Sequence, residues 1–266
     1  MLENELTGGV GSIMSWRVVR IFGILVISLS LFAVTGLRTN AAQRLYFSDS
    51  ELKQGFVLSV FGSEFNQSDE ADLRVRKFNK PILFYIDNES GEKPTEVVKF
   101  INSLRHMVPT LRYTLTPDPA AANYRVHLLD PENLSQHYLE RRQHLTGQLI
   151  TSQNESNIQC FGEAGVNQNS EILFVDVFIP MYDDFKERRS CIVEEIMQGM
   201  GPMNDSSLLP YSIFNDANND VIYDVTIFDL YIMNMLYHPA IRPGMQRKQV
   251  MPILSSVLPV VKKIVK

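Results

Sequence analysis

Residues 190–205 read SCIVEEIMQGMGPMND, and this stretch decides the fold. Ser190 is a residue type that caps helix N-termini, and Gly201 followed by Pro202 ends helices. Between these signals, apolar residues recur at the spacing of one helix face. The stretch therefore predicts a helix over Ser190–Met200 whose core side is formed by Ile192, Ile196, Met197 and Met200.

The polar side of this helix carries Glu194, Glu195 and Gln198. Glu194 and Gln198 are four residues apart, so they share a face. In the zinc-protease helix H-E-x-x-H, two histidines at this spacing bind zinc, and the glutamate between them activates the metal-bound water. Aligned on that frame, Glu195 takes the position of the general base.

The zinc ligands of the frame are all replaced. Glu194 stands at the first histidine position and Gln198 at the second, and Asn204 stands at the third position of the longer metzincin motif. Zinc favours nitrogen and sulfur ligands, and an amide oxygen is a weak donor. We therefore expect no zinc cofactor. The alternative is a hard cation bound by the oxygens of Glu194, Glu195, Asn204 and Asp205.

Three blocks carry a family resemblance: CIVEEIMQGMGPMNDS at 191–206, SIFND at 212–216 and DLYIMNMLYHPAIRPGM at 229–245. In this order they resemble the bacterial envelope family named domain of unknown function 2927, over about residues 78–245. Such domains look like relatives of zincin-type metallopeptidases whose motif reads E-E-x-x-Q. Residues 211–214 are similar to the Ser-Ile-Met turn beneath metzincin zinc sites, with Phe214 in the methionine position. The resemblance implies a fold and a cellular address, and it implies no reaction.

Residues 21–37, IFGILVISLSLFAVTGL, contain no charge, and Arg17 and Arg20 precede them. Small residues follow up to Ala42, which completes the order of a secretory signal. A retained membrane anchor is the alternative, because 17 residues is the short end of a membrane span; a buried core helix is a third interpretation. Under the first two, the domain lies outside the cytoplasm. We expect a cell-envelope protein, either periplasmic or anchored in the inner membrane through residues 21–37.

The chain has two cysteines, Cys160 and Cys191. In an oxidising compartment two thiols of one domain most often pair, so we expect a disulfide. The alternative is two buried free thiols.

The charge balance argues against nucleic acid as a partner. The formal net charge is −5, and without residues 1–42 it is −6, because 22 basic residues then face 28 acidic ones. An acidic domain without a basic stripe is a poor match for a phosphate backbone.

The remaining sequence predicts interleaved strands and helices without strict alternation, which favours the α+β class. We expect residues 1–42 to be a signal or anchor, 43–77 a linker or outer segment, 78–245 the zincin-like domain and 246–266 a C-terminal helix. Strands are predicted at 81–87, 111–116, 124–129 and 171–179, and further helices at 95–107, 132–145 and 226–237. The mixed sheet is expected to pack on the Ser190–Met200 helix.

The histidines indicate no site of their own. His137 and His144 lie two turns apart on one predicted helix, too far to share a small ion without other ligands. His106, His127 and His238 stand alone, and we expect them on the surface or half-buried.

These observations predict a non-catalytic binding or structural module. We expect the face with Glu194, Glu195 and Gln198 to line a degenerate active-site cleft, and this cleft to bind a peptide or another envelope component. The alternative is a hydrolase with an oxygen-ligand metal site and Glu195 as general base.

Overall fold

The computed structural model describes residues 46–61, 73–146, 158–215 and 222–265, all within one unit, Thr39–Lys266. The predicted export segment, residues 21–37, lies outside the described residues. In the part of the chain that is described, no helix combines the length and apolar character needed to cross a membrane.

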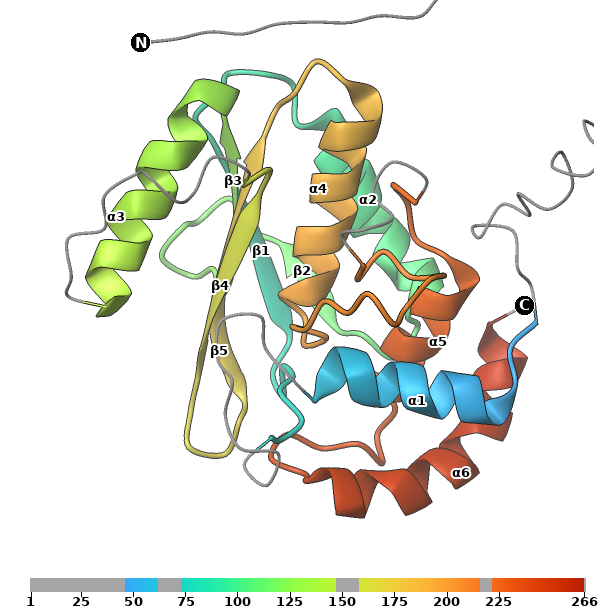
Figure 1. The fold of residues 1–266 in the computed structure, drawn as a ribbon. Helices are drawn as coiled ribbons and strands as arrows, with labels where there is room; N and C mark the ends of the chain where they lie inside the picture. The colour runs from blue at the N-terminus through green and yellow to red at the C-terminus, as the bar shows by residue number, and fades with distance from the viewer. Residues whose placement is uncertain (1–45, 62–72, 147–157, 216–221, 266) are drawn as a thin grey trace, which may run out of the picture. The chain divides into compact units, whose positions relative to one another are not determined.

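Five strands form one mixed sheet in the order β2-β1-β3-β5-β4 (Figure 1). Four of them are parallel, and β4 runs antiparallel to β5 at one edge. The strands are β1 (Ile82–Asn88), β2 (Tyr113–Leu115), β3 (Tyr124–Leu129), β4 (Phe161–Val166) and β5 (Ile172–Pro180). The α+β class and the mixed sheet are therefore confirmed.

Strand β4 was not predicted from the sequence. Its sequence, FGEAGV, contains two glycines and one charge, so it lacks the apolar alternation that marks a strand. Pairing with β5, from Phe161↔Phe178 to Val166↔Ile172, fixes its conformation instead. Tertiary pairing here overrides weak local propensity.

Helices α2 (Thr95–Met107) and α4 (Phe185–Gln198) cover one face of the sheet, and α3 (Leu134–Thr146) covers the other (Figure 1). The strand residues Phe84, Tyr124 and Val177 belong to the large core cluster on the α2–α4 side. On the α3 side a smaller cluster consists of Leu129, Leu134, Tyr138, Phe161 and Phe178. The two faces of the sheet are therefore covered by different core clusters, a large one on the α2–α4 side and a small one on the α3 side.

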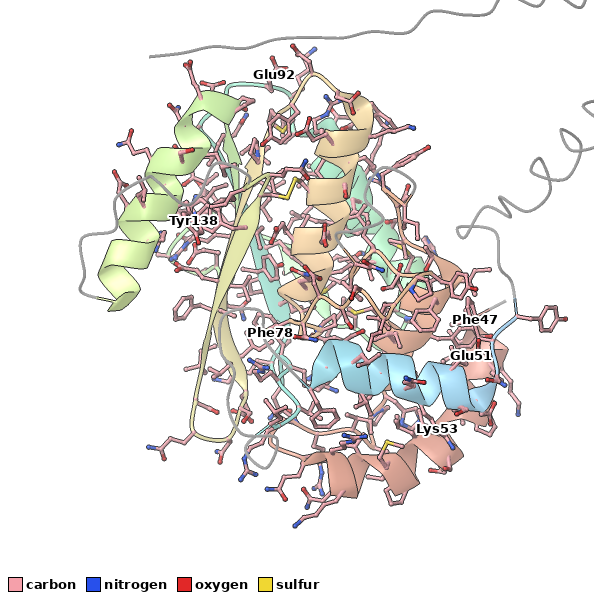
Figure 2. The ribbon with its side chains drawn as sticks, in the orientation of Figure 1. Phe47, Glu51, Lys53, Phe78, Glu92 and Tyr138 are labelled. Carbon is pink, nitrogen blue, oxygen red and sulfur yellow. A yellow bond between two sulfur atoms is a disulfide. The ribbon has the colours of Figure 1, made fainter. Side chains whose placement is uncertain are left out.

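Three more helices, α1 (Asp49–Val60), α5 (Ile227–Leu236) and α6 (Arg247–Ile264), pack on one another beside the sheet (Figure 1). Residues 43–77 were expected to be a linker or outer segment, yet α1 places Leu52, Phe56 and Val60 fully inside the core. Lys53 Nζ donates to Ser255 Oγ of α6 over 2.9 Å, and Phe47, just before α1, stacks edge-on against Phe228 (Figure 2). Helix α1 is therefore part of the packed fold.

Candidate functional site

Helix α4 carries the predicted motif, but it begins earlier than the sequence analysis placed it. Asp184 caps the N-terminus by accepting from the backbone N–H groups of Lys186 and Glu187. Ser190 is buried inside the helix, so its predicted capping role is wrong. An aspartate that satisfies two first-turn N–H groups caps effectively, and this allows one more turn before Ser190. The helix ends at Gln198, close to the predicted end.

The two motif carboxylates lie inside the protein. Glu194 is 5% exposed and Glu195 is 8% exposed. A Cβ atom on Gly162 of β4 would lie 3.1 Å from Glu195 Oε2, so the edge strand passes directly over this carboxylate. The Glu195 side chain of α4 therefore faces β4.

A disulfide joins α4 to the residue that precedes β4. Cys160 and Cys191 are bonded, with their Cα atoms 5.8 Å apart, as the yellow bond in Figure 2 shows. The predicted pairing is confirmed. The bond adds a covalent link at the place where β4 begins to run over the motif.

The amide residues of the motif form hydrogen bonds within the protein. Gln198 Nε2 donates to Asp205 Oδ1. Asn204 Nδ2 donates to the backbone oxygen of Leu58, in α1, over 2.7 Å. The structure thus brings Gln198 and Asp205 together, whereas Asn204, at the third histidine position, is hydrogen-bonded to another helix.

The end of α4 is fastened to the sheet by Tyr124 of β3. Its hydroxyl donates to the backbone oxygens of Glu195 (3.1 Å) and Ile196 (2.9 Å). Burial, reinforced by the nearby Glu195 carboxylate, raises the pKa of Tyr124 well above its ordinary value, so the hydroxyl remains a donor. A Cβ atom on Gly199 would lie 2.2 Å from this hydroxyl oxygen, which explains a glycine here.

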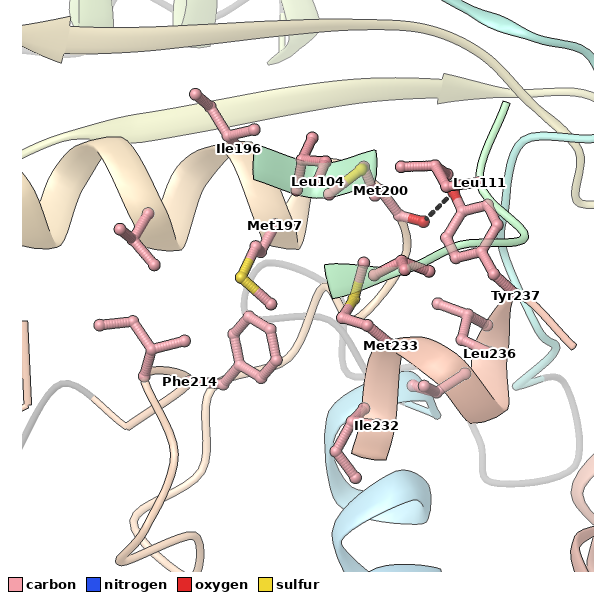
Figure 3. Packing of buried hydrophobic residues seen from close by; sticks show 14 of the residues in the cluster. Leu104, Leu111, Ile196, Met197, Met200, Phe214, Ile232, Met233, Leu236 and Tyr237 are labelled. Carbon is pink, nitrogen blue, oxygen red and sulfur yellow. Dashed lines mark hydrogen bonds between the residues drawn. The ribbon is translucent and has the colours of Figure 1, made fainter. Parts of the chain in front are cut away.

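The turn after α4 is fastened by a buried carboxylate. Asp229 is fully buried and accepts from Ser212 Oγ (2.5 Å), from Ile213 N (3.3 Å) and from Thr226 Oγ1 (2.8 Å). Burial raises the pKa of Asp229 to about 6, against these hydrogen bonds, which lower it. The turn places Phe214 against the apolar side of α4, where it faces Met197 (Figure 3).

The side chains of this region do not fit zinc. The three histidine positions of the frame hold a buried carboxylate and two amides whose nitrogens donate to protein oxygens. Zinc sites use imidazole or thiolate as their main donors, and neither occurs at these positions. The residues at these positions of α4 are therefore unsuited to hold a zinc ion.

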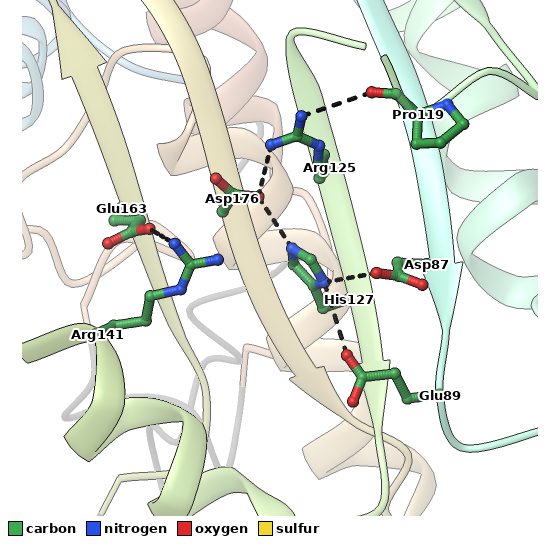
Figure 4. Close-up of polar contacts among 8 residues, drawn as sticks. All are labelled: Asp87, Glu89, Pro119, Arg125, His127, Arg141, Glu163 and Asp176. Atoms are coloured by element: carbon green, nitrogen blue, oxygen red, sulfur yellow. Dashed lines mark hydrogen bonds and ion pairs between the residues drawn. The ribbon is translucent and has the colours of Figure 1, made fainter. Parts of the chain in front are cut away.

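A second polar cluster lies on the other face of the sheet, and sequence reasoning missed it. His127 of β3 is 7% exposed, not at the surface or half-buried as expected. It lies between Asp176 of β5 and Asp87 of β1 (Figure 4). Burial alone would raise the pKa of Asp176, but the hydrogen bond and the electrostatic interaction with His127, followed by the charges of Arg141 and Arg125, outweigh it and lower this pKa. The available signal was Asp176 itself, a charge inside the apolar run ILFVDVFI.

A cavity of about 230 Å³ opens near the start of β1 and the end of α5. Basic residues dominate its charged lining: Lys77, Lys80, Arg112 and Arg242. Lys77 Nζ donates to the backbone oxygens of Leu236 (2.8 Å) and Ile241 (3.0 Å), and burial lowers the pKa of Lys77 to about 8. Lys77 therefore satisfies carbonyls at and beyond the C-terminus of α5, which is a structural role.

A family model described as a protein of unknown function (DUF2927) matches residues 49–256. The match starts with α1 and ends inside α6, so it is wider than the range inferred from the three sequence blocks. No curated protein and no solved structure matches the chain.

Proposed function

The chain belongs to the DUF2927 family of proteins of unknown function, and from this premise we propose that it is a non-catalytic binding module of the cell envelope. In this proposal its domain is zincin-like, and a peptide or a peptide-like part of another envelope component binds beside the degenerate motif, along the edge strand β4 that passes over α4. The protein acts by holding this ligand, not by cleaving it.

One observation carries the proposal: the residues at the former zinc positions belong to the internal structure. Glu194 is buried, Gln198 is bonded to Asp205, and Asn204 is bonded to Leu58. Rearranging these residues around an ion would break the hydrogen bonds that Gln198 and Asn204 now make, which costs free energy unless new partners replace them. In this proposal the former ligand positions therefore serve packing, and binding uses the neighbouring strand β4.

The edge strand β4 supplies a physical binding mode. Within the described residues, β4 pairs only with β5, so its outer edge offers backbone donors and acceptors. An extended peptide can add to such an edge as a further strand, with main-chain hydrogen bonds giving affinity. The disulfide and α4 hold this edge in place from behind.

The envelope location in this proposal rests on the apolar residues 21–37 with arginines before them. The Cys160–Cys191 bond is consistent with it, because disulfides persist in oxidising compartments. If the segment is not cleaved, it is the contact with the membrane.

The runner-up is a hydrolase in which Glu195 is the general base and a hard cation is held by oxygens of Glu194, Asn204 and Asp205. Burial of two adjacent carboxylates is the feature that favours it. Such burial can separate pKa values and prepare acid–base chemistry.

Metal analysis of the full-length chain separates these two functions. The variants are Glu194→Gln and Glu195→Gln, with Glu187→Gln in the partly exposed first turn of α4 as the matched control. The binding module predicts the same metal content in all of them. Stoichiometric metal that disappears in the two motif variants but not in the control would contradict the binding module and support the hydrolase.

The binding mode is tested by hydrogen exchange with a mixture of unstructured peptides, such as a casein digest, at increasing concentration. Added protection is expected at Phe161–Val166 (β4) and not at Tyr113–Leu115 (β2), the opposite edge strand, which is the internal control. Equal exchange in β4 with and without peptide would exclude strand addition.

A further inference from the structure

In the polar cluster on the α3 side of the sheet, three atoms that could bind a metal ion lie close together. His127 Nδ1 lies 3.2 Å from Asp87 Oδ2 and 3.9 Å from Glu89 Oε1 (Figure 4). The three atoms lie within 4.8 Å of one another. An imidazole nitrogen and two carboxylate oxygens form a mixed donor set of the kind that binds divalent metal ions.

Asp176 determines which nitrogen of His127 faces this point. Asp176 Oδ1 lies 2.9 Å from His127 Nε2, and the carboxylate is 2% exposed on β5. A buried carboxylate accepts a hydrogen bond, so Nε2 carries the proton and the lone pair of a neutral ring is on Nδ1. Histidines that bind metals are commonly held by a carboxylate in this way.

The separations match those around a single ion. Two atoms each about 2.1 Å from a metal are roughly 3.0 Å apart at a right angle and roughly 3.4 Å apart at the tetrahedral angle. The His127–Asp87 separation of 3.2 Å lies inside this range. The Glu89 separation of 3.9 Å is longer, but the Glu89 side chain is 39% exposed and has room to move inward.

The backbone holds the three residues rigidly. Asp87 and His127 are register partners on the adjacent strands β1 and β3. Glu89 follows β1, and its N–H donates to the backbone oxygen of Leu128 over 3.0 Å. His137 of α3 lies 3.2 Å from the other carboxylate oxygen of Glu89 and so orients that side chain. The ring of His127 is stacked on Phe178, with centroids 4.5 Å apart.

We propose that Asp87, Glu89 and His127 bind one divalent transition-metal ion, with Asp176 and His137 as positioning residues. Asp87 is 42% exposed, so solvent or an anionic ligand can complete the coordination. The site lies at the carboxyl end of β1, beside β3, where parallel sheets commonly place ligands. It is on the opposite face of the sheet from α4, and it does not depend on the proposed function.

The donor set also predicts a metal preference. Imidazole suits zinc, iron and nickel better than magnesium or calcium, whereas the carboxylates accept all of them. Zinc is therefore expected to bind more tightly than magnesium.

The test uses the full-length chain in mild detergent, without a polyhistidine tag and stripped of metal by a chelator. Calorimetric titration with Zn²⁺ is expected to give one saturable site per chain, and Mg²⁺ a much weaker signal. Asp87→Asn and Glu89→Gln are each expected to weaken zinc binding by at least about tenfold. The matched controls are Asp130→Asn and Glu92→Gln, exposed acidic residues nearby in the sequence, and they should bind as the wild type does.

Substitution with Co²⁺ gives a second readout, because its visible absorption reports nitrogen and oxygen ligation directly and does not depend on stability. The absence of saturable zinc binding, or binding that persists in both ligand variants, would overturn the proposal. In that case the contacts of His127 with Asp87 and Asp176 serve only to hold the sheet together. Binding lost in Glu195→Gln but kept in the ligand variants would also overturn it and would assign the ion to α4.

Discussion

The two faces of the sheet present their carboxylates in opposite ways. On the α4 face, Glu194 and Glu195 are 5% and 8% exposed. On the α3 face, Asp87 and Glu89 are 42% and 39% exposed around a buried histidine. The face that carries the Glu194–Gln198 spacing has both of these glutamates inside the packing, whereas the α3 face directs its donors toward solvent.

This difference teaches that motif spacing and ligand convergence are separate properties. An i, i+4 pair on a helix is visible in sequence because the two residues are close along the chain. Convergence depends on what surrounds the pair. At α4 the pair is surrounded by the edge strand, the disulfide and Tyr124. These neighbours cover Glu195 and fix the helix in place, so the motif residues contribute to packing.

The largest loss of stability is expected from Asp229→Ala, which removes the carboxylate that fastens the turn after α4. The change removes the acceptor for the buried Ile213 and Thr226 N–H groups and for the Ser212 hydroxyl. Each unsatisfied buried group costs about 1–3 kcal/mol, so unfolding free energy should fall by on the order of 4 kcal/mol. Urea denaturation followed by circular dichroism measures it. The control Asp224→Ala removes a more exposed ion pair with Arg189 and should cost less than about 1 kcal/mol.

The same carboxyl predicts a pH dependence. Its folded pKa of about 6 is above the ordinary value of 3.8. The folded state therefore holds this proton more tightly, and the resulting stability is complete below pH 3.8 and is lost as pH rises through 6. Unfolding free energies from pH 4 to pH 7 should show this component in the wild type and not in Asp229→Ala. Identical slopes in the two proteins would contradict the assignment.

The next largest effect is expected from removing the disulfide. Cys160 and Cys191 are 31 residues apart, and a bond closing a loop of this length stabilises the folded chain by roughly 3–4 kcal/mol. The double variant Cys160→Ser/Cys191→Ser should lose that stability and should show faster amide exchange in β4 than in β2. Uniform exchange across both edge strands would mean that the bond does not order β4.

Local patterns predicted much of this fold. The α2 helix, with apolar residues at Val97, Ile101 and Leu104, is found at Thr95–Met107 as expected, and β3 at Tyr124–Leu129. The disulfide and the family resemblance were also predicted correctly. The helix and the strand depend on residues close in sequence, the disulfide on residue type, and the family resemblance on three blocks that recur in order.

Features that depend on distant pairing were not predictable. Strand β4 forms because β5 is beside it, and nothing in FGEAGV marks it. The cap at Asp184 took precedence over Ser190 because its carboxylate accepts from two N–H groups of the first turn, whereas Ser190 is buried inside the helix. The His127 cluster needs three strands in register, β1, β3 and β5, and each contributes one polar residue that has no meaning on its own.

Asp176→Asn is expected to have the smallest effect on stability. It also tests the contrast between the two faces of the sheet most directly. This change keeps the shape of the side chain but weakens the hydrogen bond that fixes the His127 ring. Stability should fall by only about 1–2 kcal/mol, since one charged hydrogen bond is weakened. Zinc affinity should fall roughly 10–100-fold, as expected for a residue that orients a metal ligand.

Glu163→Gln is the matched control for this variant, because Glu163 lies opposite Asp176 on β4 but pairs with Arg141 rather than with His127. It should leave zinc affinity unchanged, although it removes one negative charge from the same face. Calorimetric titration of the three proteins gives the comparison. Equal affinity in the Asp176→Asn variant and the wild type would show that Asp176 does not orient the His127 ring. The buried polar groups of the α3 face would then have the same structural role as those of the α4 face.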